Sequence, residues 1–412
     1  MLNKKRAESR WILDNGMKVF ETHADMGEER VRRLEDLAFK YGQYSESYLV
    51  TEPNRSYLWS SCDNGVVGFV RQGGHVAIVG GIITHDDNKI AFIHEIAEFA
   101  KSNKVRVMFY HIDDRDAPLF RQAGFQVTKF GVDARIPLAG HNWSGKSFEW
   151  VRRQFNFVSR HGVLFEEWSA EKSTPAEWEH RLGELQEVSA EHINAKHFRG
   201  EIPFFEGRLL NEHLYRRRCF VARAENGNGR IEGFVVCTPI DNGRQWAMEM
   251  YRHRVDAVRG VIPFLMHQTI ERLKAEGCEG VSMCPVPAIG CEKKQPGDSI
   301  VARTALTLWN RLGSALFDTN GLYHYKSRFR PEFTDMYLCS SSNVTVMSIW
   351  AYLRLTRAFD LKIGAFLKGL IHLLNPQRRT LAKPVLVPQP AFTAELVVAS
   401  APVAVPSESK AA

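Results

Sequence analysis

The order of short β runs and helices restricts the fold of this sequence more than any other feature, because the same order occurs twice. A segment of β runs with Gly and Asn-Gly turns at 57–83 precedes an amphipathic helix at 89–104 and an apolar strand at 105–113. The second half repeats the order with a hairpin at 219–240, a strand at 245–254, a helix at 260–277 and a strand at 278–287. This alternation predicts an α/β fold of mixed sheets flanked by helices.

The chain of 412 residues is too long for a single small core, so we expect two domains. Beyond residue 384 the composition changes to Pro, Ala, Val and Ser, which is typical of disorder. The predicted division is an N-terminal helical segment at 1–45, a first domain at 46–150, a second at 151–340, a basic amphipathic helix at 344–376 and a disordered tail at 384–412.

Charge and cysteine content limit the class of protein. The net charge is +7, from 54 Lys and Arg against 47 Asp and Glu. Residues 344–383 hold seven Lys or Arg and one Asp, and so carry +6 of it. The seven cysteines are odd in number and none are spaced C-x-x-C, so neither disulfides nor a metal site is expected. The first sixteen residues are charged and hold no apolar core of signal-peptide length, and no window reaches about 18 uncharged apolar residues, so we expect neither a signal peptide nor a transmembrane helix. We expect a reducing, cytoplasmic protein, with a peripheral position on the inner membrane face as a further option.

A basic and aromatic segment at 320–333, "NGLYHYKSRFRPEF", ends the second predicted domain. In an extended chain, alternate side chains point to opposite faces. One face then carries Tyr323, Tyr325 and Phe329, and the other carries His324, Lys326, Arg328 and Arg330. Such a row of cations with aromatic support is suited to the phosphate of a lipid head group or of a tRNA 3′ end. The alternative is a strand with its aromatics in the core and its bases in solvent.

The predicted helix at 344–376 has an apolar stripe with basic flanks. The stripe consists of Ile349, Tyr352, Phe359, Ile363, Phe366, Leu370 and Leu373, flanked by Arg354, Arg357, Lys362 and Lys368. A basic amphipathic helix can lie in the head-group region of an anionic membrane, where each cation contributes about 1 kcal/mol. The alternative is packing on the protein body or on a second copy of the chain.

Several motifs resemble a known family. "PLFRQAGFQVTKFG" is similar to the closing helix and strand of the GNAT acyltransferase fold. "SGKSFEWVRRQFNFVSRHG", "EIPFFEG", "EMYRHRVDAVRGVIPFL" and "GLYHYKSRFRPEF" resemble, in this order, the cytosolic catalytic domain of phosphatidylglycerol lysyltransferases and alanyltransferases, over roughly residues 40–340. The resemblance implies two tandem GNAT-like domains that move an aminoacyl group from aminoacyl-tRNA to a lipid hydroxyl, without a metal or other cofactor. Family members usually carry a membrane-embedded translocase, which we expect this chain to lack.

The resemblance also implies site residues. Glu249 occupies the position of the family's catalytic Asp, and Arg252 that of its Arg; the alternative is an ordinary ion pair at a strand end. In a regular strand these two side chains point to opposite faces, so sharing one site requires a bulge or the end of the strand. The implied substrate-binding residues are Lys326, Arg328 and Tyr325 in the basic segment, and Lys196, Glu201 and Phe204 in a loop near the amino-acid pocket.

Two other functions stay open at this point. A CoA-dependent GNAT N-acyltransferase binds pyrophosphate on a glycine-rich turn, but "RVDAVRGV" places the bulky Arg259 there, and the Gly80–Gly81 pair does not fit the pattern. A non-catalytic protein that binds membrane or RNA is the second option, because Ser314 replaces an acidic residue that is common in the family. The sequence does not identify the amino acid or the acceptor, and a homodimer is compatible with it.

Overall fold

The computed structural model describes residues 11–13, 16–195, 204–209, 216–225, 229–312 and 318–357. All of them belong to one compact unit, Met1–Leu374. Of the predicted segments, the tail at 384–412, most of the helix at 344–376, and the site residues Lys196 and Glu201 lie outside the described residues, as does Ser314.

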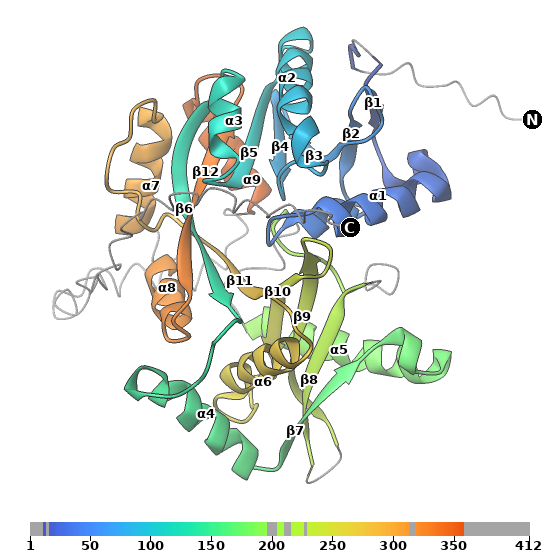
Figure 1. Ribbon diagram of the computed structural model, residues 1–412, viewed down its shortest axis with the longest axis vertical. Helices are drawn as coiled ribbons and strands as arrows, with labels where there is room; N and C mark the ends of the chain where they lie inside the picture. Colours follow the sequence, from blue (N-terminus) through green and yellow to red (C-terminus); the bar gives the residue numbers. More distant parts are fainter. Residues whose placement is uncertain are drawn as a thin grey trace, which may run out of the picture. The chain divides into compact units, whose positions relative to one another are not determined.

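The first half of the chain contains the predicted succession of strands and helices (Figure 1). Its elements are β1 (Lys18–Phe20), η1 (His23–Met26), α1 (Gly27–Tyr41), η2 (Ser47–Thr51), β2 (Ser56–Trp59), β3 (Val66–Gln72), β4 (His75–Val79), α2 (Asp86–Ser102), β5 (Arg106–Asp113), α3 (Ala117–Gln122) and β6 (Gln126–Pro137).

The second half repeats this order and adds helices at its end. Its elements are η3 (Lys146–Phe148), α4 (Glu149–Arg160), β7 (Val163–Trp168), η4 (Ala170–Lys172), α5 (Pro175–Ala195), β8 (Arg218–Ala224), β9 (Ile231–Ile240), β10 (Gln245–His253), α6 (Val261–Ala275), β11 (Gly280–Pro287), α7 (Ile300–Leu312), α8 (Thr319–Ser327), β12 (Glu332–Ser340) and α9 (Val346–Leu355).

The described strands form one mixed sheet, in the order β1-β2-β3-β4-β5-β12-β6-β11-β10-β9-β8-β7. In each half an antiparallel hairpin leads through a helix to a parallel neighbour, since β4 pairs with β5 and β10 with β11 in parallel. The predicted α/β class is therefore confirmed, and the repeat is visible in the strand pairing.

The two halves exchange their last strands. β12, from the second half, pairs with β5 of the first half, and β6, from the first half, pairs with β11 of the second. β6 and β12 also pair with each other, so they lie side by side in Figure 1 as the teal and orange strands at the centre of the sheet. This exchange joins the halves into one hydrogen-bonded sheet. The predicted domain limits remain a prediction.

Alternation along β5 gives the first half two apolar faces. Val107 and Phe109 belong to the core against α2 and α3. Met108 and Tyr110, on the opposite face, belong to a second cluster with residues of α7 and α9. Four such buried side chains in a row exclude water from both faces of the strand, which places β5 deep inside the unit.

The basic segment at 320–333 is not extended, and the predicted alternation of its faces is wrong. Residues 319–327 form α8, and β12 begins only at Glu332. The carboxylate of Asp318 accepts a hydrogen bond from the Gly321 amide at 2.8 Å and caps the first turn of the helix. The cap favours a helix, and its 3.6-residue period separates Lys326 from Arg328.

The described part of the C-terminal helix is α9, and its apolar stripe packs on the protein body. For this part of the helix, the alternative to a membrane position is therefore observed. Ile349 and Tyr352 contact the cluster that includes Met108 and Tyr110. The exposed apolar residues of α9 lie on its other side: Val346, Met347 and Trp350. Among the described residues, no helix is long and apolar enough to cross a bilayer.

Candidate functional site

A cavity of about 430 Å³ lies where β5 and β6 meet β10, β11 and the three C-terminal helices. This volume is within the usual range for small-molecule sites, about 300–1,000 Å³. Its ionisable lining includes Glu46, His111, Glu206, Glu249, Arg252 and Lys326. The lining contributed by α7 and α9 is largely apolar: Ala302, Ala305, Leu306, Trp309, Ile349, Tyr352 and Leu353. The cavity is therefore suited to a ligand that is charged in one part and apolar in another.

Glu249 reaches the cavity through a β-bulge. The register between β10 and β9 shifts between Met248 and Met250, so Glu249 is the extra residue of β10. Of the two arrangements that would let Glu249 and Arg252 share a site, a bulge or the end of the strand, the bulge is present, and both residues line the cavity.

Only one carboxylate oxygen of Glu249 has a hydrogen-bond partner among the described residues. Oε1 accepts a hydrogen bond from the Gly207 amide at 2.5 Å, whereas Oε2 is buried with no partner among the described residues. Burial raises the pKa of Glu249, and the nearby Arg217 guanidinium opposes this rise. A cation that enters the cavity would stabilise the ionised form and take up the unpartnered oxygen.

Gly207 allows the close approach on which this contact depends. A Cβ atom at this position would lie 2.4 Å from Oε1 of Glu249 and 2.8 Å from Nη1 of Arg217. Any larger residue would displace the segment that presents its amide to the carboxylate.

Arg252 is buried and fixed by its neighbours. Its guanidinium donates hydrogen bonds to the hydroxyl of Ser189, from α5, and to Oε2 of Glu206 at 3.4 Å. Because Arg252 is only 3% exposed, its charge acts in a water-poor environment. Glu206 also lines the cavity, so a carboxylate and a guanidinium stand side by side in its wall.

Lys326 is the buried cation of α8. Its ammonium donates hydrogen bonds to the carbonyl oxygens of Cys284 at 2.7 Å and Pro285 at 3.3 Å. These carbonyls lie where the register of β11 with β6 shifts between Ser282 and Pro285. Burial lowers the pKa of Lys326, and its two carbonyl contacts carry no formal charge, so an anionic ligand would be attracted to it.

The other predicted substrate contacts lie elsewhere. Tyr325 is outside the cavity lining and packs against Trp150 and Phe329, with ring centroids 6.2 and 5.8 Å away. Arg328 stacks over Trp150 at 4.4 Å. Phe204 is buried and supports the cavity from behind Phe205. Substrate binding by these three residues remains a prediction.

Three ionisable lining residues were not predicted from the sequence: Glu46, His111 and Glu206. Glu206 is the sixth residue of the motif "EIPFFEG", from which Glu201 and Phe204 were chosen. A histidine inside the apolar run "VRVMFYHID" was the available signal for His111. Within the described residues, no group of His, Cys, Asp and Glu side chains is arranged to hold a metal ion.

The repeated halves and exchanged strands define a duplicated α/β fold, and its cavity is lined by residues of both halves. Residues 35–340 match the family described as "Phosphatidylglycerol lysyltransferase, C-terminal", and the chain belongs to this family.

Individual relatives are distant. The phosphatidylglycerol lysyltransferase of Bacillus subtilis (strain 168) is 23% identical over 314 residues, which cover 76% of this chain and 35% of the relative. The Staphylococcus aureus (strain MRSA252) enzyme of the same name is 23% identical over 196 residues, or 48% of this chain and 22% of that protein. The chain therefore spans about a third or less of the length of these curated relatives.

The fold is shared with a solved structure. The structure of L-PGS from Bacillus licheniformis superposes with a TM-score of 0.66 at 21% identity, covering 81% of this chain and 97% of that one. At this identity the likeness concerns the fold.

Proposed function

We propose that this chain is an aminoacyltransferase that moves a lysyl- or alanyl-type group from aminoacyl-tRNA to the hydroxyl of a phosphatidylglycerol-like lipid at the cytoplasmic membrane surface. Family membership supports this proposal. The observation that carries it is the cavity, whose lining combines a buried carboxylate that has an unpartnered oxygen, two buried cations and an apolar wall.

The reaction exchanges one ester for another. The lipid hydroxyl oxygen forms a bond to the aminoacyl carbonyl carbon, the bond from that carbon to the tRNA ribose oxygen breaks, and the hydroxyl proton ends on the ribose oxygen. The protein must orient the two partners, transfer the proton and stabilise the oxyanion.

The charged residues suit the two substrates in different ways. An aminoacyl ester carries an ammonium group, for which Oε2 of Glu249 is the buried acceptor without a partner. The lipid phosphate and the oxyanion are negative, and Arg252 and Lys326 provide cations in the same cavity. In our proposal Glu249 binds the amino acid, while the two cations bind the phosphate or the oxyanion.

The apolar wall suits an acyl chain. α7 and α9 turn alanine, leucine, isoleucine and aromatic side chains to the cavity. On their outer sides both helices expose large apolar residues: Ile300 and Leu308 on α7, and Val346, Met347 and Trp350 on α9. Such a surface can rest on a membrane, which would bring the acceptor lipid beside the cavity.

Contacts at the two candidate pyrophosphate turns disfavour a CoA-dependent enzyme. After β10, the amides of Val255 and Val258 donate to Glu191 at 2.7 Å and to Glu232 at 3.0 Å, so the protein's own carboxylates take the donors that a pyrophosphate would need. After β4, a Cβ atom on Gly81 would lie 2.1 Å from the Tyr44 ring, so a side chain already fills that turn.

The direct test is transfer of label. The protein is incubated with radiolabelled aminoacyl-tRNA and vesicles of phosphatidylglycerol and phosphatidylethanolamine, and in a parallel reaction with labelled acetyl-CoA and amines. We expect lipid-extractable label in the first reaction. Product in the second reaction alone would identify a CoA enzyme. Binding to vesicles or tRNA without any product would identify a non-catalytic protein.

A matched pair of variants tests the site. Glu249→Gln keeps the acceptor for the Gly207 amide but removes the charge, so we expect kcat/KM to fall about 10- to 150-fold, the value of a charged hydrogen bond of about 1.5–3 kcal/mol. Glu166→Gln removes a carboxylate of β7 that pairs with Arg223 of β8. Both residues are outside the cavity lining, so transfer should be unchanged. Equal rates in both variants would remove Glu249 from the site.

A further inference from the structure

A glutamate and a histidine of the first half form a buried pair in the cavity wall. Nδ1 of His111 lies 2.6 Å from Oε2 of Glu46, and both side chains are 6% exposed. Nε2 of His111 is buried without a hydrogen-bond partner among the described residues. The ring stacks on Phe205 at 5.1 Å, which fixes its plane. One ring nitrogen is thus oriented by a carboxylate, and the other is left for a ligand.

The backbone of β5 is distorted so that His111 faces the cavity. The register between β12 and β5 shifts between Tyr337 and Cys339, opposite Tyr110 and His111. His111 has a φ of +61°, in the left-handed region that residues other than glycine rarely adopt. In a regular strand His111 would point away from Tyr110, yet both line the cavity. Strain of this kind is found preferentially at functional sites.

The second half contains the corresponding distortion. β11 is the parallel strand that follows α6, as β5 follows α2, and Cys284 on β11 has a φ of +68° beside its own register shift. The carbonyl of Cys284 holds Lys326. Equivalent strands of the two halves therefore each use a left-handed residue to place a functional group in the same cavity.

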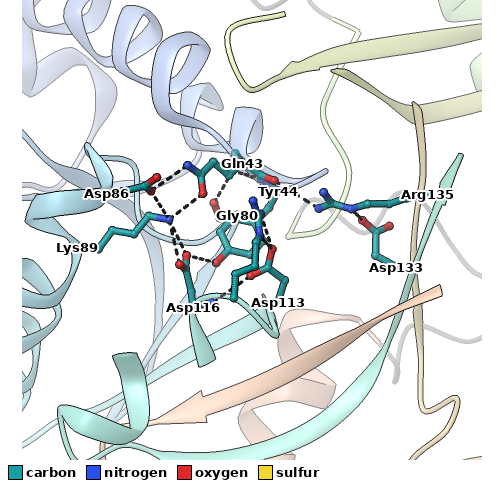
Figure 2. A network of polar contacts seen from close by, with 11 residues as sticks. Gln43, Tyr44, Gly80, Asp86, Lys89, Asp113, Asp116, Asp133 and Arg135 are labelled. Carbon is teal, nitrogen blue, oxygen red and sulfur yellow. Dashed lines mark hydrogen bonds and ion pairs between the residues drawn. The ribbon is translucent and has the colours of Figure 1, made fainter. Parts of the chain in front are cut away.

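Glu46 is held in place from both sides. Before it, the carbonyl oxygen of the Gln43 side chain accepts a hydrogen bond from Lys89 at 2.8 Å, and the Tyr44 hydroxyl donates to Asp116 at 2.5 Å (Figure 2). After it, the hydroxyl of Ser47 donates to the carbonyl of Gly80 at 2.7 Å. These contacts restrict Glu46 before any substrate arrives, which is what an orienting carboxylate requires.

This arrangement explains why residue 80 is a glycine. Its φ is +87°, and a Cβ atom would lie 2.4 Å from the carbonyl oxygen of Glu46. The glycine pair after β4, which does not fit the pattern of a pyrophosphate turn, is the place where the Glu46 segment packs against the sheet.

We infer that His111 is the general base of the transfer and that Glu46 is its positioning residue. This inference rests on the proposed function. Because an ionised carboxylate only accepts hydrogen bonds, Nδ1 carries the hydrogen and Nε2 holds the lone pair. Nε2 takes the proton of the lipid hydroxyl while the hydroxyl oxygen forms a bond to the aminoacyl carbonyl carbon. The imidazolium, stabilised by Glu46, then gives this proton to the ribose oxygen as the bond from carbon to that oxygen breaks.

His111→Gly is the sharpest variant, because glycine adopts a φ of +61° without strain and leaves space for an added imidazole. We expect kcat to fall about 10²- to 10⁴-fold, the usual contribution of a general base, with KM for both substrates nearly unchanged. Added imidazole should restore part of the rate in His111→Gly but not in Glu249→Gln. Glu46→Gln should also lower kcat, because an amide can favour the wrong tautomer.

His141→Gln serves as the control, since His141 is outside the cavity lining, and His111→Gln checks that the loss does not depend on one variant. A wild-type kcat in both His111 variants, or a change confined to KM, would overturn the role of His111 while the proposed function stands. If the wild-type protein transfers no label from aminoacyl-tRNA, the proposed function fails, and the role of His111 in it fails as well.

Discussion

Gly80→Ala should be strongly destabilising, because Gly80 is buried against the Glu46 segment. The new Cβ atom would lie 2.4 Å from the carbonyl oxygen of Glu46 and 2.9 Å from Cα of Ser47. Both are backbone atoms at the start of η2, so no flexible side chain can move aside. The Glu46 segment itself must shift, and the hydrogen bond from Ser47 to Gly80 must lengthen or break.

The cost has two parts, and Gly73→Ala separates them. Gly73 also has a positive φ, +61°, but a Cβ atom there would meet nothing within 4 Å. Gly73→Ala should therefore cost only the left-handed backbone, about 1–2 kcal/mol. Gly80→Ala adds a forced displacement of packed atoms, about 1–3 kcal/mol. We therefore expect the free energy of unfolding of Gly80→Ala to be lower than that of Gly73→Ala by about 1–3 kcal/mol.

Urea unfolding followed by tryptophan fluorescence measures the difference. Transfer assays on the same samples should show a kcat loss close to that of Glu46→Gln for Gly80→Ala, and no loss for Gly73→Ala. Equal stability and equal kcat in the two variants would refute the packing of the Glu46 segment on Gly80.

Two further predictions concern pH and membranes. His267 stacks on Trp143 and on Phe155, and burial lowers its pKa to about 4. The folded state therefore binds the proton less well than the unfolded state does. As a result, the free energy of unfolding should fall as the pH decreases from about 6.5 to 4. His267→Phe should flatten this part of the curve of stability against pH, and an unchanged slope would contradict the assignment. Replacing Met347 and Trp350 by serine should reduce flotation with anionic vesicles, whereas serine at Ile12, which is 58% exposed, should not; equal flotation would exclude α9 from the membrane surface.

The repeated strands and helices could be predicted from the sequence because their signals are local. The apolar runs of β5 and β11 and the amphipathic α2 are each contained within about twenty residues, and the structure has them where the sequence places them. The exchange of β6 and β12 was not predictable in this way, since it depends on pairing between strands about 200 residues apart.

The candidate site was partly predictable. The spacing of Glu249 and Arg252 indicated that a shared site needs either a bulge or the end of the strand, and the resemblance pointed to Lys326. The alternating charge pattern of 320–333 predicted an extended segment, which is wrong, because residues 319–327 form a helix that Asp318 caps. Glu46 and His111 escaped notice because they are 65 residues apart and His111 enters the cavity only through a left-handed backbone.

Mass spectrometry of lipids tests the central claim most directly. Lipids are extracted from cells that express this chain and from cells that express Glu249→Gln at the same level. The account predicts a phospholipid in the first extract that is heavier than its parent by one amino-acid residue, and its loss or strong reduction in the second. Identical lipid profiles, from cells in which both proteins are folded and abundant, would contradict it.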